Sequence, residues 1–426
     1  METDRRTFFM QLGAGMAALA QAGVWNELAA QTARTARDSA EAVAMDEDYW
    51  APIQRAYLRS PYVTNLNNGG VSPQPIVVQE AFERFNRFSN EAPAYTMWQI
   101  LDKGREKIRA ELAELGGCSP EEVAVVRNTT EALAIAVFGL ELKAGDEVVL
   151  TKQDYPNMIH DWKLREKRDG VKLVWLDLEM PFENPTYAVE KFAAAFGPRT
   201  KAVQITQMIN WTGQIMPVRQ IADLARSRGI ATICDGAHTF AHYPFKIPDL
   251  GCDYFGTSLH KWLSAPFGTG MLYVKKEKIG GLWPLFPNQL FDTDDVRKFE
   301  WMGTRSIPTE AGIATALEFH RAVGSERKAA RLRYLKNYWA KKAAQIPGVK
   351  IHTSFKDEFS GALALFSVEG KKPSEVERHL MDKHRIYVVA IEWENISGVR
   401  VTPHIYTTLD DLDRLVKGIA EIAEKK

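Results

Sequence analysis

Two short segments place an acid, a histidine and a lysine where side chains could do chemistry. Asp235 and His238 come at the end of an apolar run, and Lys261 lies 26 residues beyond Asp235, directly after Ser-Leu-His. Lysine is almost never fully buried unless it is paired or reactive, so Lys261 is an unusual packing residue. A desolvated lysine loses proton affinity, and its neutral amine can form a Schiff base. The alternative for Lys261 taken alone is an exposed lysine that follows a strand.

The pairing of Lys261 with Asp235 predicts the cofactor pyridoxal 5′-phosphate (PLP). An aspartate at a neighbouring strand end suits the pyridine nitrogen of PLP, because its charge keeps that nitrogen protonated and the ring able to accept electrons. Thr129 opens a helix after a strand, where free N–H groups bind phosphate, although simple capping is compatible. Tyr155 follows another strand and could stack on a flat ring. Asn210 also follows a strand, where a turn asparagine is the alternative.

The elements that must position these residues form an alternating pattern. Short apolar runs that predict strands are separated by helical stretches, and they fall at residues 123–126, 147–151, 171–176, 201–207, 230–234, 254–257 and 270–274. Such alternation indicates a buried, mostly parallel sheet with helices on both faces, which binds ligands beyond the carboxyl ends of its strands. After Pro308 the chain predicts long helices broken near Gly324, and then a smaller α+β domain. We therefore divide the chain into residues 1–45, 46–305 and 306–426.

Composition excludes several classes of protein. The 426 residues include 54 Lys plus Arg and 54 Asp plus Glu, so the formal net charge is zero, and 45% are hydrophobic. This apolar content excludes intrinsic disorder, and the charge balance argues against broad nucleic-acid binding. No stretch of about 18 residues is apolar throughout, so no conventional membrane span is predicted. Three cysteines are too few for a disulfide framework.

The first 45 residues predict an export signal and a spacer. Arg5 and Arg6 precede a weakly apolar stretch rich in Ala and Gly, which is the layout of a twin-arginine signal. Candidate cleavage sites end at Ala20 and Ala30, and residues 31–45 are small and polar. We expect a periplasmic protein. The alternative is an amphipathic N-terminal helix with a chance arginine pair, and the protein would then be cytoplasmic.

Several motifs resemble those of one enzyme superfamily. The chain resembles class V aminotransferases in several motifs. These are Asp235 with His238, Ser-x-His-Lys at 258–261, Phe-Glu-x-x-Gly-Thr-Arg at 299–305, Asn-Asn-Gly-Gly-Val-Ser-Pro at 67–73 and Val-Arg-Val-Thr-Pro-His at 399–404. The similarity spans about residues 60–420. The nearest subgroup looks isopenicillin N epimerase-like, and the N-terminus is similar to that of an exported member involved in pyoverdine maturation. The resemblance implies PLP fold type I: a mostly parallel seven-stranded sheet between helices, with a smaller C-terminal α+β domain.

The resemblance also implies residue roles. Lys261 would form the Schiff base and shuttle the α-proton, Asp235 would pair with the pyridine nitrogen, His238 would hydrogen-bond the phenolic oxygen, and Tyr155 would stack on the ring. The phosphate would be bound by Thr129, Thr130, Ser258 and His260, and by Gly303 and Thr304 of a second subunit, which implies a homodimer. Arg400 would clamp the substrate carboxylate, with Asn210 beside the cofactor and Asn68 and Gly69 on the substrate side.

Other functions fit the sequence less well. His238 and His242 have metal-site spacing, but the glutamate that a metal hydrolase needs beside the first histidine is absent, and we expect no metal at the site. No glycine fingerprint predicts a dinucleotide site. A non-catalytic PLP-binding protein is a remaining alternative. No cysteine follows Cys252, which excludes persulfide-forming desulfuration but not a direct C–S lyase. For an amino acid or peptide-like substrate, we place aminotransferase ahead of epimerase and lyase.

Overall fold

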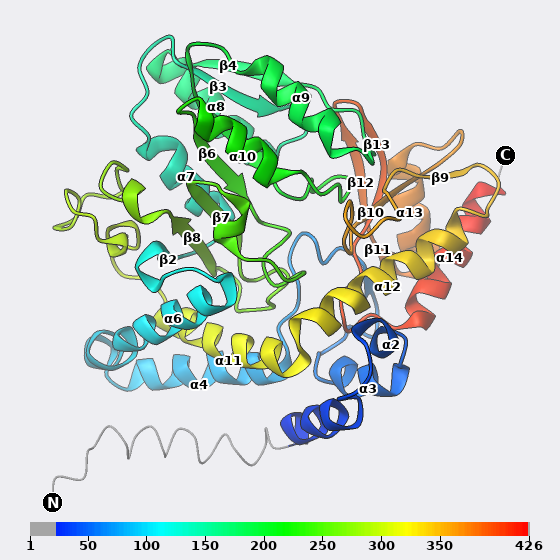
Figure 1. Ribbon diagram of the computed structural model, residues 1–426. Coiled ribbons are helices and arrows are strands. Elements are labelled where there is room, and N and C mark those ends of the chain that lie inside the picture. The colour runs from blue at the N-terminus through cyan, green and yellow to red at the C-terminus, as the bar shows by residue number, and fades with distance from the viewer. Residues whose placement is uncertain (1–22, 425–426) are drawn as a thin grey trace, which may run out of the picture.

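The computed structural model describes residues 23–424 (Figure 1). Arg5, Arg6 and the candidate cleavage site at Ala20 lie outside these residues. Within the described part of the chain, no helix combines the length and the hydropathy that crossing a bilayer requires.

A seven-stranded sheet forms the centre of the larger part of the molecule. Its strand order is β2-β8-β7-β6-β5-β3-β4. The bounds are β2 Val123–Val126, β3 Glu147–Thr151, β4 Lys172–Leu176, β5 Thr200–Thr206, β6 Ala231–Asp235, β7 Tyr254–Ser258 and β8 Gly270–Val274. All pairings are parallel except those of β8, which runs against β7 and β2. The predicted mostly parallel seven-stranded sheet is confirmed.

Helices cover both faces of this sheet, as predicted (Figure 1). Alternate side chains of a strand point to opposite faces. In β2, Ala124 and Val126 join the core beneath α7 and α8, whereas Val123 and Val125 join the core beneath α6 and α10. The helix bounds are α6 Arg105–Gly116, α7 Thr129–Gly139, α8 Pro156–Asp169, α9 Pro185–Ala195 and α10 Val218–Ser227.

A smaller α+β domain follows two long helices. These are α11 (Ile307–Val323) and α12 (Ser325–Ala343), which meet at Gly324, the predicted break. The domain contains a four-stranded antiparallel sheet of order β12-β13-β10-β9, covered by helices. Its elements are β9 Val349–Ile351, β10 Ala364–Val368, α13 Pro373–His384, β11 Ile386–Tyr387, β12 Val389–Trp393, β13 Ile396–Val401 and α14 Leu409–Ala423. The short strand β9 was not predicted from the sequence.

The N-terminal segment connects the two parts. Strand β1 (Thr64–Asn65) pairs with β11 of the small domain, and α4 (Ile76–Glu91) packs on α11. Residues 23–34 are helical, and α2 (Ala40–Ala44) packs on α12. Leu28 is only 2% exposed, and Val43 is also in the core. Val43 is therefore a core residue within the stretch 31–45 that composition predicted to be a spacer, and Leu28 is a core residue within the predicted signal segment.

Candidate active site

Lys261 and His238 meet at the carboxyl ends of neighbouring strands. His238 follows β6, Lys261 follows β7, and Lys261 Nζ lies 3.4 Å from His238 Nε2. Burial lowers the pKa of the Lys261 amine to about 8, with Asp235 opposing the shift and Arg400 adding to it. Burial, aided by Lys261, also holds the pKa of His238 well below its ordinary value, so the ring is neutral. The structure thus provides a half-buried amine with lowered proton affinity, which can act as a nucleophile or a base near neutral pH.

Asp235 ends β6 and is 3% exposed. Its Oδ1 accepts a hydrogen bond from the backbone N–H of Ala237 at 2.9 Å. Burial raises the pKa of this carboxyl group, while the backbone bond and the charge of Lys261 act in the opposite direction. A buried carboxylate of this kind favours a protonated partner, as the pyridine nitrogen of PLP would be.

Arg400 reaches the same site from β13 of the small domain. It donates to the backbone carbonyl of Asn210 at 2.9 Å and to Asn67 Oδ1 at 2.7 Å. The residue is 7% exposed, and burial lowers its pKa to about 10. Within residues 23–424 no ion pair joins Arg400 to a carboxylate. A buried cation without an anion is costly, so this guanidinium is prepared for an anionic ligand.

The glycine/asparagine turn brings the N-terminal segment to the site. The Gly69 N–H donates to Thr402 Oγ1 at 2.9 Å, and a Cβ at residue 69 would lie 3.4 Å from the His238 ring. Asn68 is fully buried, and all its amide hydrogen bonds go to Asn65, Thr402 and Tyr406. The side chain of Asn67, rather than that of Asn68, therefore contacts the arginine on the substrate side.

The expected phosphate-binding residues gather at the N-terminus of α7. The Thr129 N–H donates to Ser258 Oγ at 2.9 Å, and the two hydroxyl oxygens lie 2.8 Å apart. Thr130 is the second residue of α7, where backbone N–H groups are available to an anion. His260 donates from Nδ1 to the Thr269 carbonyl, and burial lowers its pKa to about 4. A phosphate contact by Nε2 requires the protonated ring, which a nearby phosphate would favour.

Tyr155 precedes α8 and is 41% exposed. It lies near enough to Arg400 to interact with it electrostatically. Its neighbour Asp154 is a residue that the sequence analysis missed. Asp154 is buried, accepts hydrogen bonds from Thr206 Oγ1 at 2.6 Å and from the Thr151 N–H at 2.9 Å, and burial raises its pKa to about 7. These bonds hold the loop that carries Tyr155. In the sequence, the role of Asp154 could have been inferred only from the position of an acidic residue in a turn at the end of a strand.

Gly303 and Thr304 do not join this cluster. Both are exposed, and no described atom lies within 4 Å of a Cβ built at Gly303, whose φ is +80°. In the described chain no hydrogen bond links either residue to Lys261 or its neighbours. The two residues form the tip of a loop whose ends, Glu300 and Arg305, are fixed.

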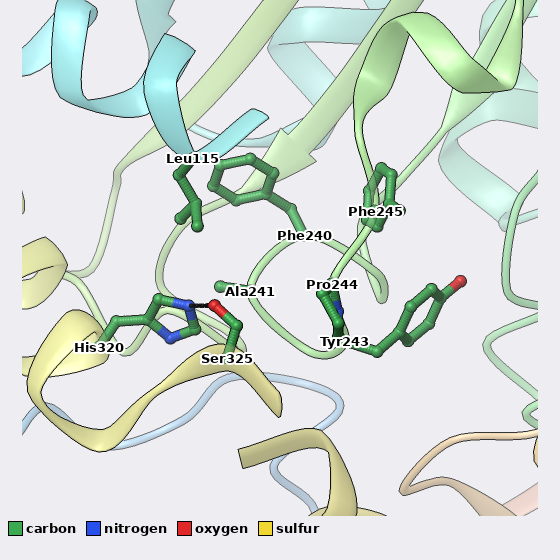
Figure 2. Close-up of a pocket in the computed structure, with 8 residues that line it drawn as sticks. All are labelled: Leu115, Phe240, Ala241, Tyr243, Pro244, Phe245, His320 and Ser325. Atoms are coloured by element: carbon green, nitrogen blue, oxygen red, sulfur yellow. Dashed lines mark hydrogen bonds between the residues drawn. The ribbon is translucent and has the colours of Figure 1, made fainter. Parts of the chain in front are cut away.

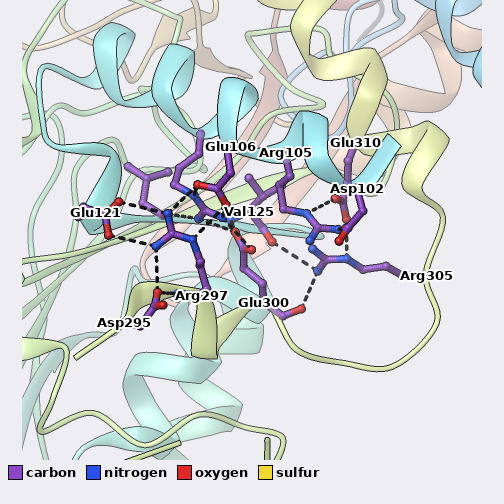
Figure 3. Close-up of polar contacts among 12 residues, drawn as sticks. Asp102, Arg105, Glu106, Glu121, Val125, Asp295, Arg297, Glu300, Arg305 and Glu310 are labelled. Atoms are coloured by element: carbon purple, nitrogen blue, oxygen red, sulfur yellow. Dashed lines mark hydrogen bonds and ion pairs between the residues drawn. The ribbon is translucent and has the colours of Figure 1, made fainter. Parts of the chain in front are cut away.

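Figure 3 shows the polar network that fixes this loop. Glu300 Oε1 accepts from Arg109 Nη1 at 2.7 Å and from the Val125 N–H at 2.6 Å. Arg305 pairs with Glu310 at 2.6 Å and donates to the Glu300 carbonyl at 2.9 Å. Glu300 is therefore bonded to β2 and Arg305 to α11, whereas Gly303 and Thr304 at the tip of the loop are exposed.

His242 does not form a metal site with His238. Its Nδ1 contacts the His238 carbonyl at 2.7 Å, and its Nε2 accepts from the Ala362 N–H at 2.9 Å. The ring stacks on Trp262 with centroids 3.9 Å apart. Both nitrogens are therefore occupied, which agrees with a packing role.

A small cavity lies beside the segment that follows His238 (Figure 2). Its volume is about 20 Å³, and its lining includes Phe240, Tyr243 and the His320–Ser325 pair. This space suits a water molecule rather than a cofactor. The residues expected to bind PLP lie instead around Lys261.

The unused polar atoms of that group fit PLP. His238 Nδ1, Asn210 Oδ1 and Arg400 Nε are buried without a hydrogen-bond partner among the described residues. They accompany an amine for the aldehyde, a carboxylate for the ring nitrogen, and a helix N-terminus with hydroxyl groups for the phosphate. The fold and this donor set define a PLP-dependent protein of fold type I.

A family model for aminotransferase class V matches residues 64–415, and the chain belongs to this family. Its cofactor is pyridoxal 5′-phosphate. The chain is 28% identical over 391 residues to an isopenicillin N epimerase of Streptomyces clavuligerus, covering 87% of this chain and 97% of the relative. It is 27% identical over 384 residues to a probable cysteine desulfurase of Halalkalibacterium halodurans, covering 84% and 93%.

Solved structures share the fold. A cystine C–S lyase in complex with cysteine persulfide superposes with a TM-score of 0.76 at 22% identity, covering 85% of this chain and 98% of that chain. A cysteine desulfurase of Escherichia coli gives a TM-score of 0.77 at 22% identity, covering 88% and 98%. The predicted family, fold and cofactor are confirmed. The similarity to an exported pyoverdine-maturation protein stays a prediction.

Proposed function

We propose that this class V enzyme is an aminotransferase acting on the amino group of an amino acid or a peptide-like substrate. The observation that carries the proposal is the buried guanidinium of Arg400, which has no carboxylate partner in residues 23–424 and lies close enough to affect the pKa of Lys261. An α-carboxylate would supply the missing charge by a bidentate pair. The substrate amine and Cα would then lie beside the Lys261 amine.

The residues around Lys261 have separate roles in this proposal. PLP, when bound, withdraws electrons from the substrate Cα. The Lys261 amine would hold the cofactor through its aldehyde and would serve as the base for the Cα proton. Asp235 would keep a proton at the ring nitrogen, and the neutral His238 would hydrogen-bond the phenolic oxygen. Thr129, with Thr130, Ser258 and His260, orients the phosphate at the α7 terminus.

Two features favour transamination. Transamination would need a single base on one face of Cα, and desolvation lowers the pKa of the half-buried Lys261 amine to about 8. Persulfide formation needs a reactive thiol, whereas Cys234 and Cys252 are buried. Burial also raises the pKa of Cys118 to about 12, so its thiol is a poor nucleophile.

Epimerisation is the second candidate, because two isopenicillin N epimerases match almost their whole length at 28% identity. Return of the proton to the opposite face of Cα requires a second acid. Tyr155, which lies near Arg400, is the side chain we assign to that role if the enzyme is an epimerase.

A stopped-flow screen of amino donors tests these alternatives. Conversion of the holoenzyme to the pyridoxamine form, with release of a keto acid, supports transamination. Incorporation of solvent deuterium at Cα with inversion, and without that conversion, would identify an epimerase. Release of pyruvate and ammonia would identify a lyase. An unchanged spectrum with every donor would indicate a non-catalytic PLP-binding protein.

We also propose that the active form is a homodimer. Gly303 and Thr304 lie at the tip of a fixed loop without contact to the site of their own chain, and Trp301, Trp98 and Phe267 are exposed aromatic residues. Exposed aromatic residues are typical of protein interfaces. In the dimer, Gly303 and Thr304 would contact the phosphate in the partner subunit.

Export by the twin-arginine route is a further part of the proposal. It is supported by Arg5 and Arg6 before an Ala- and Gly-rich stretch. The Arg5→Lys/Arg6→Lys double variant should remain in the cytoplasm, as measured by fractionation. An unchanged periplasmic yield would reject the signal.

A further inference from the structure

Three side chains of the small domain converge between helices that carry no residue of the candidate active site. His379 and His384 belong to α13, and Glu421 belongs to α14. One potential ligand atom from each lies within 4.8 Å of the other two. The cluster therefore contains two imidazole nitrogens and one carboxylate oxygen on two packed helices.

The geometry is close to that of a coordination site. His384 Nε2 lies 3.0 Å from Glu421 Oε2, and His379 Nε2 lies 3.9 Å from the same oxygen. The imidazole centroids are 5.5 Å apart. Ligand bonds of about 2.0–2.2 Å in a tetrahedron place ligand atoms about 3.3 Å apart. Small rotations of the side chains would close the site around an ion.

Gly418 leaves room for the imidazole ring of His384. A Cβ at Gly418 would lie 2.8 Å from His384 Cδ2, so the absence of a side chain lets this ring rest directly on α14. Gly418 and Glu421 are three residues apart and lie on one face of the helix. His384 is also the last residue of α13, because Arg385 has a φ of +54° and ends the helix. The ring is therefore held beside the carboxylate by the backbone of both helices.

The cluster is sheltered but accessible. The side chains of His379 and His384 are 8% and 11% exposed, whereas that of Glu421 is 41% exposed. An ion could enter from the carboxylate side, and a water molecule could complete its coordination. Lys417 is the neighbouring cation that acts on Glu421 together with the two histidines.

We propose that His379, His384 and Glu421 bind a divalent transition-metal ion, with Zn²⁺ as the probe, and that the ion joins α13 to α14. Two imidazoles and one carboxylate suit Zn²⁺, whereas Mg²⁺ and Ca²⁺ prefer all-oxygen sites. The ion would stabilise the small domain at the helix end that leads into β11 and Tyr387. The competing explanation is an ion pair between protonated His384 and Glu421, which would need no metal.

Calorimetric titration of the holoenzyme with Zn²⁺ separates the two explanations. We expect saturable binding of one ion per chain and a higher thermal midpoint with Zn²⁺. His384→Gln and His379→Gln should each weaken binding by roughly tenfold or more. His160→Gln, which changes an exposed histidine of α8, is the matched control and should bind Zn²⁺ like the wild type.

A rescue variant keeps the test independent of folding losses. His384→Cys restores a zinc ligand but cannot form the imidazolium–carboxylate pair. It should regain Zn²⁺ binding and give Co²⁺ thiolate absorption bands that are absent from the Co²⁺-loaded wild type. Absence of saturable Zn²⁺ binding to the wild type, or equal binding by His384→Gln, would overturn the proposal. So would a His384→Cys variant that folds, as shown by its cofactor spectrum, but does not bind.

Discussion

The guanidinium of Arg400 donates to the backbone carbonyl of Asn210 at 2.9 Å. This bond joins β13 of the small domain to the loop that follows β5 of the large sheet. A substrate carboxylate on Arg400 would therefore lie at the junction of the two parts. The same arginine lowers the pKa of the Lys261 amine, so binding of an anion would also change the proton affinity of the base.

Replacing Lys261 should abolish covalent attachment of the cofactor. Borohydride reduction of the holoenzyme, followed by peptide mapping, should find the cofactor on Lys261, and the Lys261→Ala variant should fold without the adduct. Burial lowers the pKa of Lys328 to about 7 and of Lys336 to about 8, so these two lysines are internal controls. Attachment of the cofactor to Lys328 or Lys336 would show that burial of a lysine amine is sufficient for adduct formation.

Replacing Arg400 should weaken recognition of the α-carboxylate. Hydrogen bonds to charged groups contribute about 1.5–3 kcal/mol, so Arg400→Gln should weaken binding of an amino acid by about 10- to 100-fold. Binding of the matching amine without the carboxylate should change little. Spectral titrations measure both ligands, and Arg414→Gln on the surface of α14 is the control. An equal loss for both ligands would contradict the assigned role.

Reconstitution of the apoprotein with PLP should depend on the protonation of Lys261. The neutral amine attacks the aldehyde, so the rate should rise with pH and level off above about 8, the lowered pKa of the amine. Asp235 raises this pKa and Arg400 lowers it. Asp235→Asn should therefore move the midpoint to lower pH, and Arg400→Gln should move it to higher pH. Shifts in the same direction, or a wild-type midpoint near that of free lysine, would contradict this account.

Mixed dimers should test the loop at Gly303. If this loop completes the partner's phosphate site, mixing Lys261→Ala chains with Gly303→Asp chains should restore one intact site in each mixed dimer. Random exchange of subunits then gives about a quarter of the wild-type activity. Light scattering measures the dimer itself. If both variants are inactive alone, no recovery in mixtures shown to contain mixed dimers would place the loop in the site of its own chain. A fully active Gly303→Asp homodimer would place the loop outside the site.

The mature N-terminus should lie before the buried part of the first helical segment. Leu28 is 2% exposed and Trp25 packs on Phe319, so cleavage after Ala30 would remove core contacts. Deleting residues 1–30 should lower the free energy of unfolding by about 2 kcal/mol or more relative to deleting residues 1–22. Denaturant titration measures the difference, and N-terminal sequencing of exported protein locates the cleavage. A mature chain that starts at Gln31 with full stability would contradict this expectation.

The central sheet, the cofactor and the order of the expected active-site residues along the chain could be predicted from the amino-acid sequence. Apolar runs such as that of β6 can be buried only in a covered sheet, and Asp235 and Lys261 follow runs of this kind. The sequence by itself did not determine side-chain contacts between segments distant along the chain. Only the tertiary structure placed Asn67, rather than Asn68, on Arg400, because the Asn68 amide is used within the fold.

The same limit explains what the sequence analysis missed. The role of Asp154 depends on Thr206, 52 residues away, and the burial of Leu28 depends on packing with distant elements. The histidines of α13 meet Glu421 only because α14 packs there and Gly418 leaves room. The spacing of apolar residues indicates which face of a helix or strand is buried. It does not indicate which other element packs against that face.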